Sequence, residues 1–174
     1  ARGLGVLVSF AGAVLAPLGI AKLAGPPLFT GTQVGAVTDG AFTVQTAKTR
    51  PCIGQVSSAP RVDIASAYPG ADGTAIDAFS AAGARGVVVE AMGAGNAGQA
   101  VVAAVARAVT HGVAVAVTTR VPGGGTCAAY GPGHDLAEAG AVLVPRPRSS
   151  QARGLLSAAL GAGLPVDDVV TRWG

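Results

Sequence analysis

The sequence has few charged residues and few aromatic residues. Only 12% of its 174 residues are charged, 4% are aromatic, and the formal net charge is +3. Without a basic run, and with so few rings to stack on bases, we expect no nucleic-acid partner. Half of the residues are hydrophobic. This excludes a disordered tail, because so apolar a chain can bury enough surface to offset its ordering entropy.

Cysteine and histidine are scarce as well, with two residues of each type. Cys52 and Cys127 lie far apart in the chain and form neither a CxxC motif nor a disulfide framework. A zinc site would need both cysteines together with His111 and His134, at spacings that no standard zinc site uses. We therefore expect no metal and no cofactor.

Glycine is abundant, with 27 copies beside 11 prolines, and it separates apolar runs as the turns of an α/β protein do. The uncharged residues 3–21 have the outline of a signal peptide or a membrane span. Four glycines and Pro17 would weaken a membrane helix, and the alternation of Leu4, Val6 and Val8 predicts a strand instead. We expect no membrane association, and the sequence favours the cytoplasm.

Residues 1–46 are predicted to be rich in β-structure. Gly12 predicts a turn between two strands. Asp39-Gly40 lies between β-forming runs and predicts a hairpin, because glycine tolerates the positive φ of a type I′ turn. We interpret residues 1–46 as the end of a larger domain, since their apolar strands would need further partners. The polar, proline-containing residues 47–60 are expected to be a linker.

Residues 61–174 alternate between strand and helix patterns. This order predicts an α/β fold, with a parallel sheet and helices on both of its faces. Residues 121–140 are expected to be mostly loop, and Asp72 and Ser149 or Ser150 are expected to cap helices. The expected strands are 62–65, 86–90, 113–117 and 141–144, and the expected helices are 72–82, 97–110, one from Ser149 or Ser150, and one from Pro165.

A glycine-rich turn with the pattern G-x-G-x-x-G separates the second of these strands from its helix. It contains Gly93, Gly95, Asn96 and Gly98. A dinucleotide site would also need an acidic residue about 20 positions further on, and the following strand ends instead at Arg120. An arginine there could bind the 2′-phosphate of NADP, so the dinucleotide interpretation stays open. Three other interpretations are a tight turn without a ligand, an Asn96 that caps the helix, and an Asn96 that presents its amide to a polar ligand at the carboxyl edge of the sheet.

Two further polar segments follow this turn. Residues 118–126 leave a buried strand through a glycine run, and we expect a loop that is mobile or lies against another surface. His134, Asp135 and Glu138 form a small polar cluster, which is more typical of a surface than of a catalytic site. The sequence contains no G-x-S-x-G motif and no Cys-His pair that would indicate a nucleophile.

Two long segments nevertheless resemble a known family. Residues 86–126, GVVVEAMGAGNAGQAVVAAVARAVTHGVAVAVTTRVPGGGT, are similar to the C-terminal domain of bacterial-type L-asparaginases, and so are residues 137–163, AEAGAVLVPRPRSSQARGLLSAALGAG. GVLVSFAGAVLAPLGIAKL at 5–23 and VGAVTDGAFTV at 34–44 resemble the strands that close the N-terminal domain of that family. The resemblance covers nearly the whole chain.

The resemblance implies hydrolysis of L-asparagine to L-aspartate and ammonia through a nucleophilic threonine. In this family the sites lie between the N-terminal domain of one subunit and the C-terminal domain of a neighbour, so the implied partners are the amino acid and a homo-oligomer. Asn96 matches the asparagine of the family's GxGN turn that helps to orient the substrate, and Gly93 and Gly95 support that turn. An earlier asparagine of the turn, frequent in the family, is Ala94 here.

The catalytic motifs of the family are absent from this sequence. The family carries its threonines in a TGGT-like turn and a GTD-like motif, followed by a lysine, and the chain contains neither motif. No catalytic residue can therefore be named, and the chain alone is predicted to be inactive, as half of the enzyme or as a truncated relative. The alternatives are a small α/β module that binds a nucleotide or an amino acid at residues 93–98, and a structural or interaction remnant.

Overall fold

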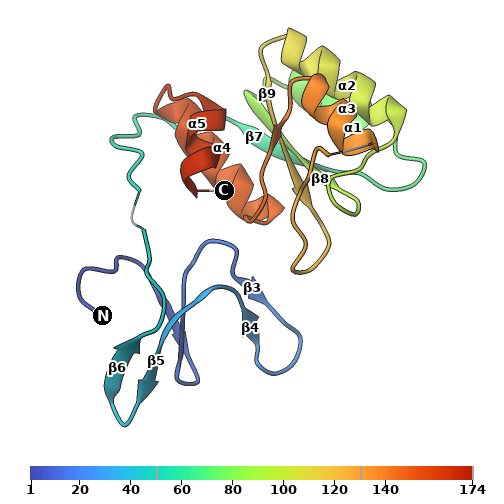
Figure 1. Ribbon diagram of the computed structural model, residues 1–174. Coiled ribbons are helices and arrows are strands. Elements are labelled where there is room, and N and C mark those ends of the chain that lie inside the picture. The colour runs from blue at the N-terminus through green and yellow to red at the C-terminus, as the bar shows by residue number, and fades with distance from the viewer. Residues whose placement is uncertain (50, 130, 174) are drawn as a thin grey trace. The chain divides into compact units, whose positions relative to one another are not determined.

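A computed structural model describes residues 1–49, 51–129 and 131–173 (Figure 1). The chain divides into two compact units, Ala1–Cys52 and Ile53–Gly174. Each unit has its own sheet or sheets.

The first unit is built from antiparallel strands. Its main sheet has the order β1-β2-β5-β6, and two shorter strands, β3 and β4, pair separately. Val14, Leu15 and Val34 are buried between these strands. The strands are β1 (Val8–Phe10), β2 (Ala13–Leu15), β3 (Ala21–Lys22), β4 (Phe29–Thr30), β5 (Gln33–Thr38) and β6 (Ala41–Val44).

The predicted hairpin between β5 and β6 is confirmed. Thr38 pairs with Ala41, and the two residues between them, Asp39 and Gly40, have φ values of 50° and 75°. Positive φ at both central positions is what a type I′ turn requires. The predicted turn at Gly12 is also present between β1 and β2, but β1 begins at Val8 and not at Leu4.

The second unit contains the predicted parallel sheet, with the strand order β10-β9-β8-β7. Figure 1 shows α1, α2 and α3 on one face of this sheet and α4 and α5 on the other. The predicted fold class is thus confirmed. The elements are β7 (Val62–Ser66), α1 (Thr74–Ala81), β8 (Gly86–Ala91), α2 (Gln99–Thr110), β9 (Ala114–Thr119), α3 (Gly131–Glu138), β10 (Val142–Leu143), α4 (Ser149–Gly161) and α5 (Val166–Trp173).

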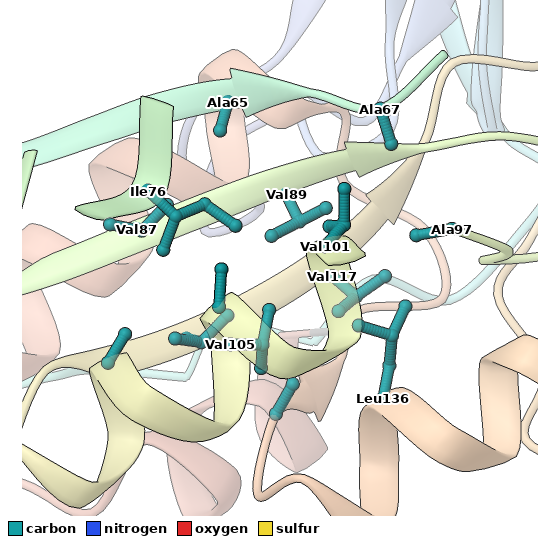
Figure 2. Close-up of a cluster of buried hydrophobic side chains, with 14 of the residues drawn as sticks. Ala65, Ala67, Ile76, Val87, Val89, Ala97, Val101, Val105, Val117 and Leu136 are labelled. Atoms are coloured by element: carbon teal, nitrogen blue, oxygen red, sulfur yellow. The ribbon is translucent and has the colours of Figure 1, made fainter. Parts of the chain in front are cut away.

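The two faces of the sheet hold separate hydrophobic cores, because successive side chains of a strand point to opposite faces. Val87, Val89 and Val117 face the first core with Val105 of α2 and Leu136 of α3 (Figure 2). The second core lies under α4 and α5. Its buried members are Val62, Val88, Ala116, Val144, Ala152, Leu156 and Val170.

Three local predictions are corrected. The segment expected to be loop contains α3, which Leu136 fixes to the core with no exposed surface. Helix α4 begins after Arg148, and neither Ser149 nor Ser150 is its N-cap. The N-cap of α1 is Gly73, although Asp72 still accepts a hydrogen bond from the main-chain N–H of Thr74 at 3.0 Å, which lowers the pKa of the Asp72 carboxyl.

None of the helices in the described part of the chain is both long enough and apolar enough to cross a bilayer.

Candidate functional site

The glycine-rich turn closes on itself at the carboxyl edge of the parallel sheet. Met92 and Asn96 form an isolated antiparallel bridge, with main-chain N···O distances of 2.9 and 2.7 Å. Gly93 and Gly95 have φ values of 49° and 106°. Residues with a side chain rarely adopt these values, so the two glycines allow the chain to reverse between β8 and α2.

Asn96 ends this turn with its side chain half-buried. Among the described residues its amide group has no hydrogen-bond partner. The interpretation of Asn96 as a helix cap is wrong, because the N-cap of α2 is Gly98 and this cap has no side-chain hydrogen bond. The amide therefore has both an N–H donor and a carbonyl acceptor available to a ligand.

The last residue of β9 and the loop that follows it form hydrogen bonds to the turn. The hydroxyl of Thr119 donates to the carbonyl of Gly93 at 2.5 Å and accepts the N–H of Val121 at 3.0 Å. Further along, the N–H of Cys127 donates to the carbonyl of Ala94 at 2.9 Å. The loop predicted to be mobile or to lie against another surface thus lies against the Asn96 turn. Sequence patterns give no sign of this contact, because it joins two irregular segments.

Replacing Thr119 with valine is expected to loosen this attachment. The change keeps the shape of the side chain but leaves the Gly93 carbonyl and the Val121 N–H without their partner, at a cost of about 1 kcal/mol in the free energy of unfolding. Thr119→Ser keeps the hydroxyl and is the matched control. Urea unfolding of both variants measures the difference, and equal stability of the two would show that the hydroxyl does not hold the turn.

A second polar group lies on the opposite face at the same edge of the sheet. Ser66, Glu90 and Thr118 occupy neighbouring positions on β7, β8 and β9. The hydroxyl of Ser149 donates to Glu90 Oε1 at 2.5 Å, and that of Ser66 donates to Oε2 at 3.1 Å. Glu90 thus fixes the first turn of α4 to the sheet. The signal that could have singled it out is an acidic residue inside the apolar strand GVVVEA.

Two hydroxyl groups near this edge are buried without a hydrogen-bond partner in the described structure, those of Thr118 and Thr126. Thr118 lies next to Glu90 in the sheet and has no exposed surface. A Cβ atom at Gly95 would lie 3.5 Å from the Cβ of Thr126, so Thr126 lies beside the Asn96 turn. Buried hydroxyl groups usually have a hydrogen-bond partner. The carboxyl edge is therefore unusual in holding two that lack one among the described residues.

The remaining residues singled out in the sequence form no common site in the described structure. Asp135 accepts a hydrogen bond from the Gln99 side chain at 3.0 Å, which joins α3 to α2, while His134 and Glu138 are exposed. Arg120 is exposed, and Cys52 and Cys127 form no disulfide bond among the described residues. Across residues 1–49, 51–129 and 131–173, no group of three His, Cys, Asp or Glu side chains has the geometry to hold a metal ion.

A comparison with protein families assigns the second unit. Residues 61–171 match the model of the glutaminase/asparaginase C-terminal domain, which includes the parallel sheet, its helices and the whole Asn96 turn. The match covers more than half of the chain and confirms the resemblance of residues 86–126 and 137–163 to the C-terminal domain of that family. The chain therefore belongs to the glutaminase/asparaginase family through its C-terminal domain.

Proposed function

We propose that this chain is the C-terminal half of an amidohydrolase that converts L-asparagine to L-aspartate and ammonia. In this proposal Asn96 presents its side-chain amide to the substrate, in a site that a neighbouring subunit completes. Gly93 and Gly95 hold the turn that carries Asn96. The observation that carries the proposal is the Asn96 amide at the carboxyl edge of the sheet, which has no hydrogen-bond partner among the described residues, in a domain of the asparaginase family.

The geometry of the turn suits a residue that orients a substrate. An asparagine amide can donate to a carboxylate and accept from an ammonium group, and a free amino acid has both. The bridge at Met92 and the contacts from Thr119 and Cys127 restrict the turn on both sides. A restricted turn lowers the entropy lost when the substrate is held, which is how a positioning group raises the reaction rate.

The nucleophile of this reaction has to come from outside the described site. Covalent amide hydrolysis needs a nucleophile and a base within hydrogen-bond reach of each other, and the sequence lacks the threonine motifs of the family. Exposed apolar side chains in the first unit support an assembly with further polypeptide. Val6 is 72% exposed and Val44 is 54% exposed, and Phe10 on the edge strand β1 is also exposed.

The test is to measure ammonia release by the chain alone and by the chain mixed with a separately produced N-terminal asparaginase domain. We expect no activity from the chain alone and L-asparagine hydrolysis from the mixture. Size-exclusion chromatography shows whether the two parts associate. A stable complex without activity would contradict the proposal, and so would activity of the chain alone.

The alternative of a small-molecule binding module predicts a different result. A module that uses residues 93–98 for a nucleotide would bind NADP without any second polypeptide. Titration of the chain with NADP, and separately with L-aspartate, followed through the Asn96 side-chain NMR signal, separates the two functions. Saturable NADP binding at that signal would favour the alternative.

A further inference from the structure

A cavity lies at the amino edge of the parallel sheet, at the opposite ends of the strands from the Asn96 turn. Its volume is about 580 Å³, within the range of sites that hold small molecules. The last turns of α1 and α2 form its sides, and the connections that lead into β8 and β9 form its base. All of its lining residues belong to the second unit.

The titratable side chains that line this cavity are mostly basic, and its other lining residues are small or apolar. Arg85, Arg107 and His111 lie around it with a single acidic residue, Asp77. Arg107 Nε and Nη2 donate to the carboxylate of Asp77 at 3.2 and 2.7 Å, which neutralises that pair and raises the pKa of Arg107. Among the described residues that line the cavity, Arg85 therefore carries a positive charge without a carboxylate partner.

Arg85 is placed to reach a ligand in this cavity. It immediately precedes β8, in which Val87 and Val89 face α1 and α2, so the alternation of the strand directs Arg85 to the same face. Its guanidinium has no ion pair or hydrogen bond within the described residues. His111 Nδ1 contacts the carbonyl of Arg107 at 2.7 Å, and its Nε2 atom has no partner in the same described set.

Basic residues also gather at helix C-termini because they complement the negative end of the helix dipole. Here the carbonyl groups at these two helix ends are hydrogen-bonded by the main chain instead of by basic side chains. The N–H of Ala82 donates to Ala78 of α1, and the N–H groups of Gly112 and Val113 donate to carbonyls of α2. The carbonyl groups thus have partners that do not depend on Arg85, which leaves the guanidinium available.

From these observations we propose that the cavity between the ends of α1 and α2 binds a small dianion, held by the Arg85 guanidinium with help from Arg107 and His111. The shared chemistry is that of a phosphate group or a dicarboxylate, because a planar guanidinium donates two parallel hydrogen bonds to either. Arg107 keeps Nη1 for the ligand while its other two nitrogens hold Asp77. The site is independent of the proposed hydrolysis, since it lies at the other edge of the sheet.

The experiment titrates the full 174-residue chain with inorganic phosphate and, in a second arm, with succinate. Amide NMR shifts of residues 83–85 and 111–113 are followed at constant ionic strength, and acetate serves as the monoanion control. We expect saturable shifts at these residues. The dianion that binds with the higher affinity shows whether the site prefers a phosphate group or a dicarboxylate. Arg85→Gln is expected to weaken binding by about tenfold or more, because a hydrogen bond between charged groups is lost.

Arg172→Gln is the matched control, since it removes the same charge from an exposed position on α5, on the opposite face of the sheet. It should change the affinity by less than about twofold. Equal weakening by both variants would show that only net charge attracts the anion, and would overturn the proposal. Absence of saturable shifts in the unmodified chain, or acetate binding as strong as that of both dianions, would overturn it as well.

Discussion

Replacing Asn96 with alanine is expected to lower kcat/KM for L-asparagine by about 10- to 100-fold in the completed enzyme. The substitution removes the carboxamide group and with it a hydrogen bond to a charged part of the substrate. Such bonds contribute about 1.5–3 kcal/mol. The free energy of unfolding should change by less than about 0.5 kcal/mol, because the Asn96 amide has no partner among the described residues. A separate activity assay and urea titration measure the two effects.

Gln99→Ala is the matched control for this prediction. It also removes a carboxamide, three residues further along, but that amide is already hydrogen-bonded to Asp135. We expect Gln99→Ala to reduce stability slightly and to leave kcat/KM within about twofold of the unmodified enzyme. If Asn96→Ala instead reduced stability and left the reaction rate unchanged, Asn96 would be a structural residue of the turn, and its assignment to the substrate would be wrong.

The regular elements of the second unit could be predicted because the pattern of apolar residues in each segment indicates which of its faces is buried. The uninterrupted apolar run at β8 is typical of a strand that is buried on both faces. The spacing of Val101 and Val105 indicates one buried helix face, and both residues are buried in the structure. Gly112 follows the end of this helix with a φ of 77°, a left-handed conformation that favours glycine and that commonly ends a helix.

Helix α3 escaped prediction because its sequence carries little of the usual helix signal. Its first three residues are Gly131, Pro132 and Gly133, and two glycines in one turn favour a loop. The helix forms nevertheless, because burying Leu136 stabilises it and proline is tolerated in a first turn. Tertiary packing therefore overrides local propensity in this segment, and a sequence read one window at a time does not contain that information.

The candidate site was predictable in position but not in its contacts. A strand-to-helix turn at the carboxyl edge of a parallel sheet follows from the order of the elements, and Asn96 lies there. The hydrogen bonds from Thr119 and Cys127 depend on how the long loop folds back, and they join residues that are distant in sequence. The same holds for Glu90, whose partners Ser66 and Ser149 come from two other elements.

Replacing Gly133 with alanine is expected to destabilise the chain by about 1–3 kcal/mol, as overpacking of a close contact does. A Cβ atom at this position would lie 2.6 Å from the carbonyl oxygen of Cys127, so the main chain of the loop has to move. The same Cβ atom would lie 3.6 Å from the carbonyl of Gly95 and 3.7 Å from Asn96 Oδ1. The movement should therefore reach the Asn96 turn, and amide NMR shifts of Gly95 and Asn96 should change.

The matched control for this substitution is Gly154→Ala in α4, where an added Cβ atom would meet no other atom within 4 Å. In that helix alanine should stabilise the chain by up to about 1 kcal/mol, because glycine is the weaker helix former. Urea unfolding of both variants compares the same chemical change in two helices and isolates the contact with Cys127. If Gly133→Ala were also stabilising, the close packing of α3 against the loop and the Asn96 turn would be contradicted. The loop would then have room to move without disturbing Asn96, and the restriction of the turn would have to come from Thr119 and the Met92 bridge alone.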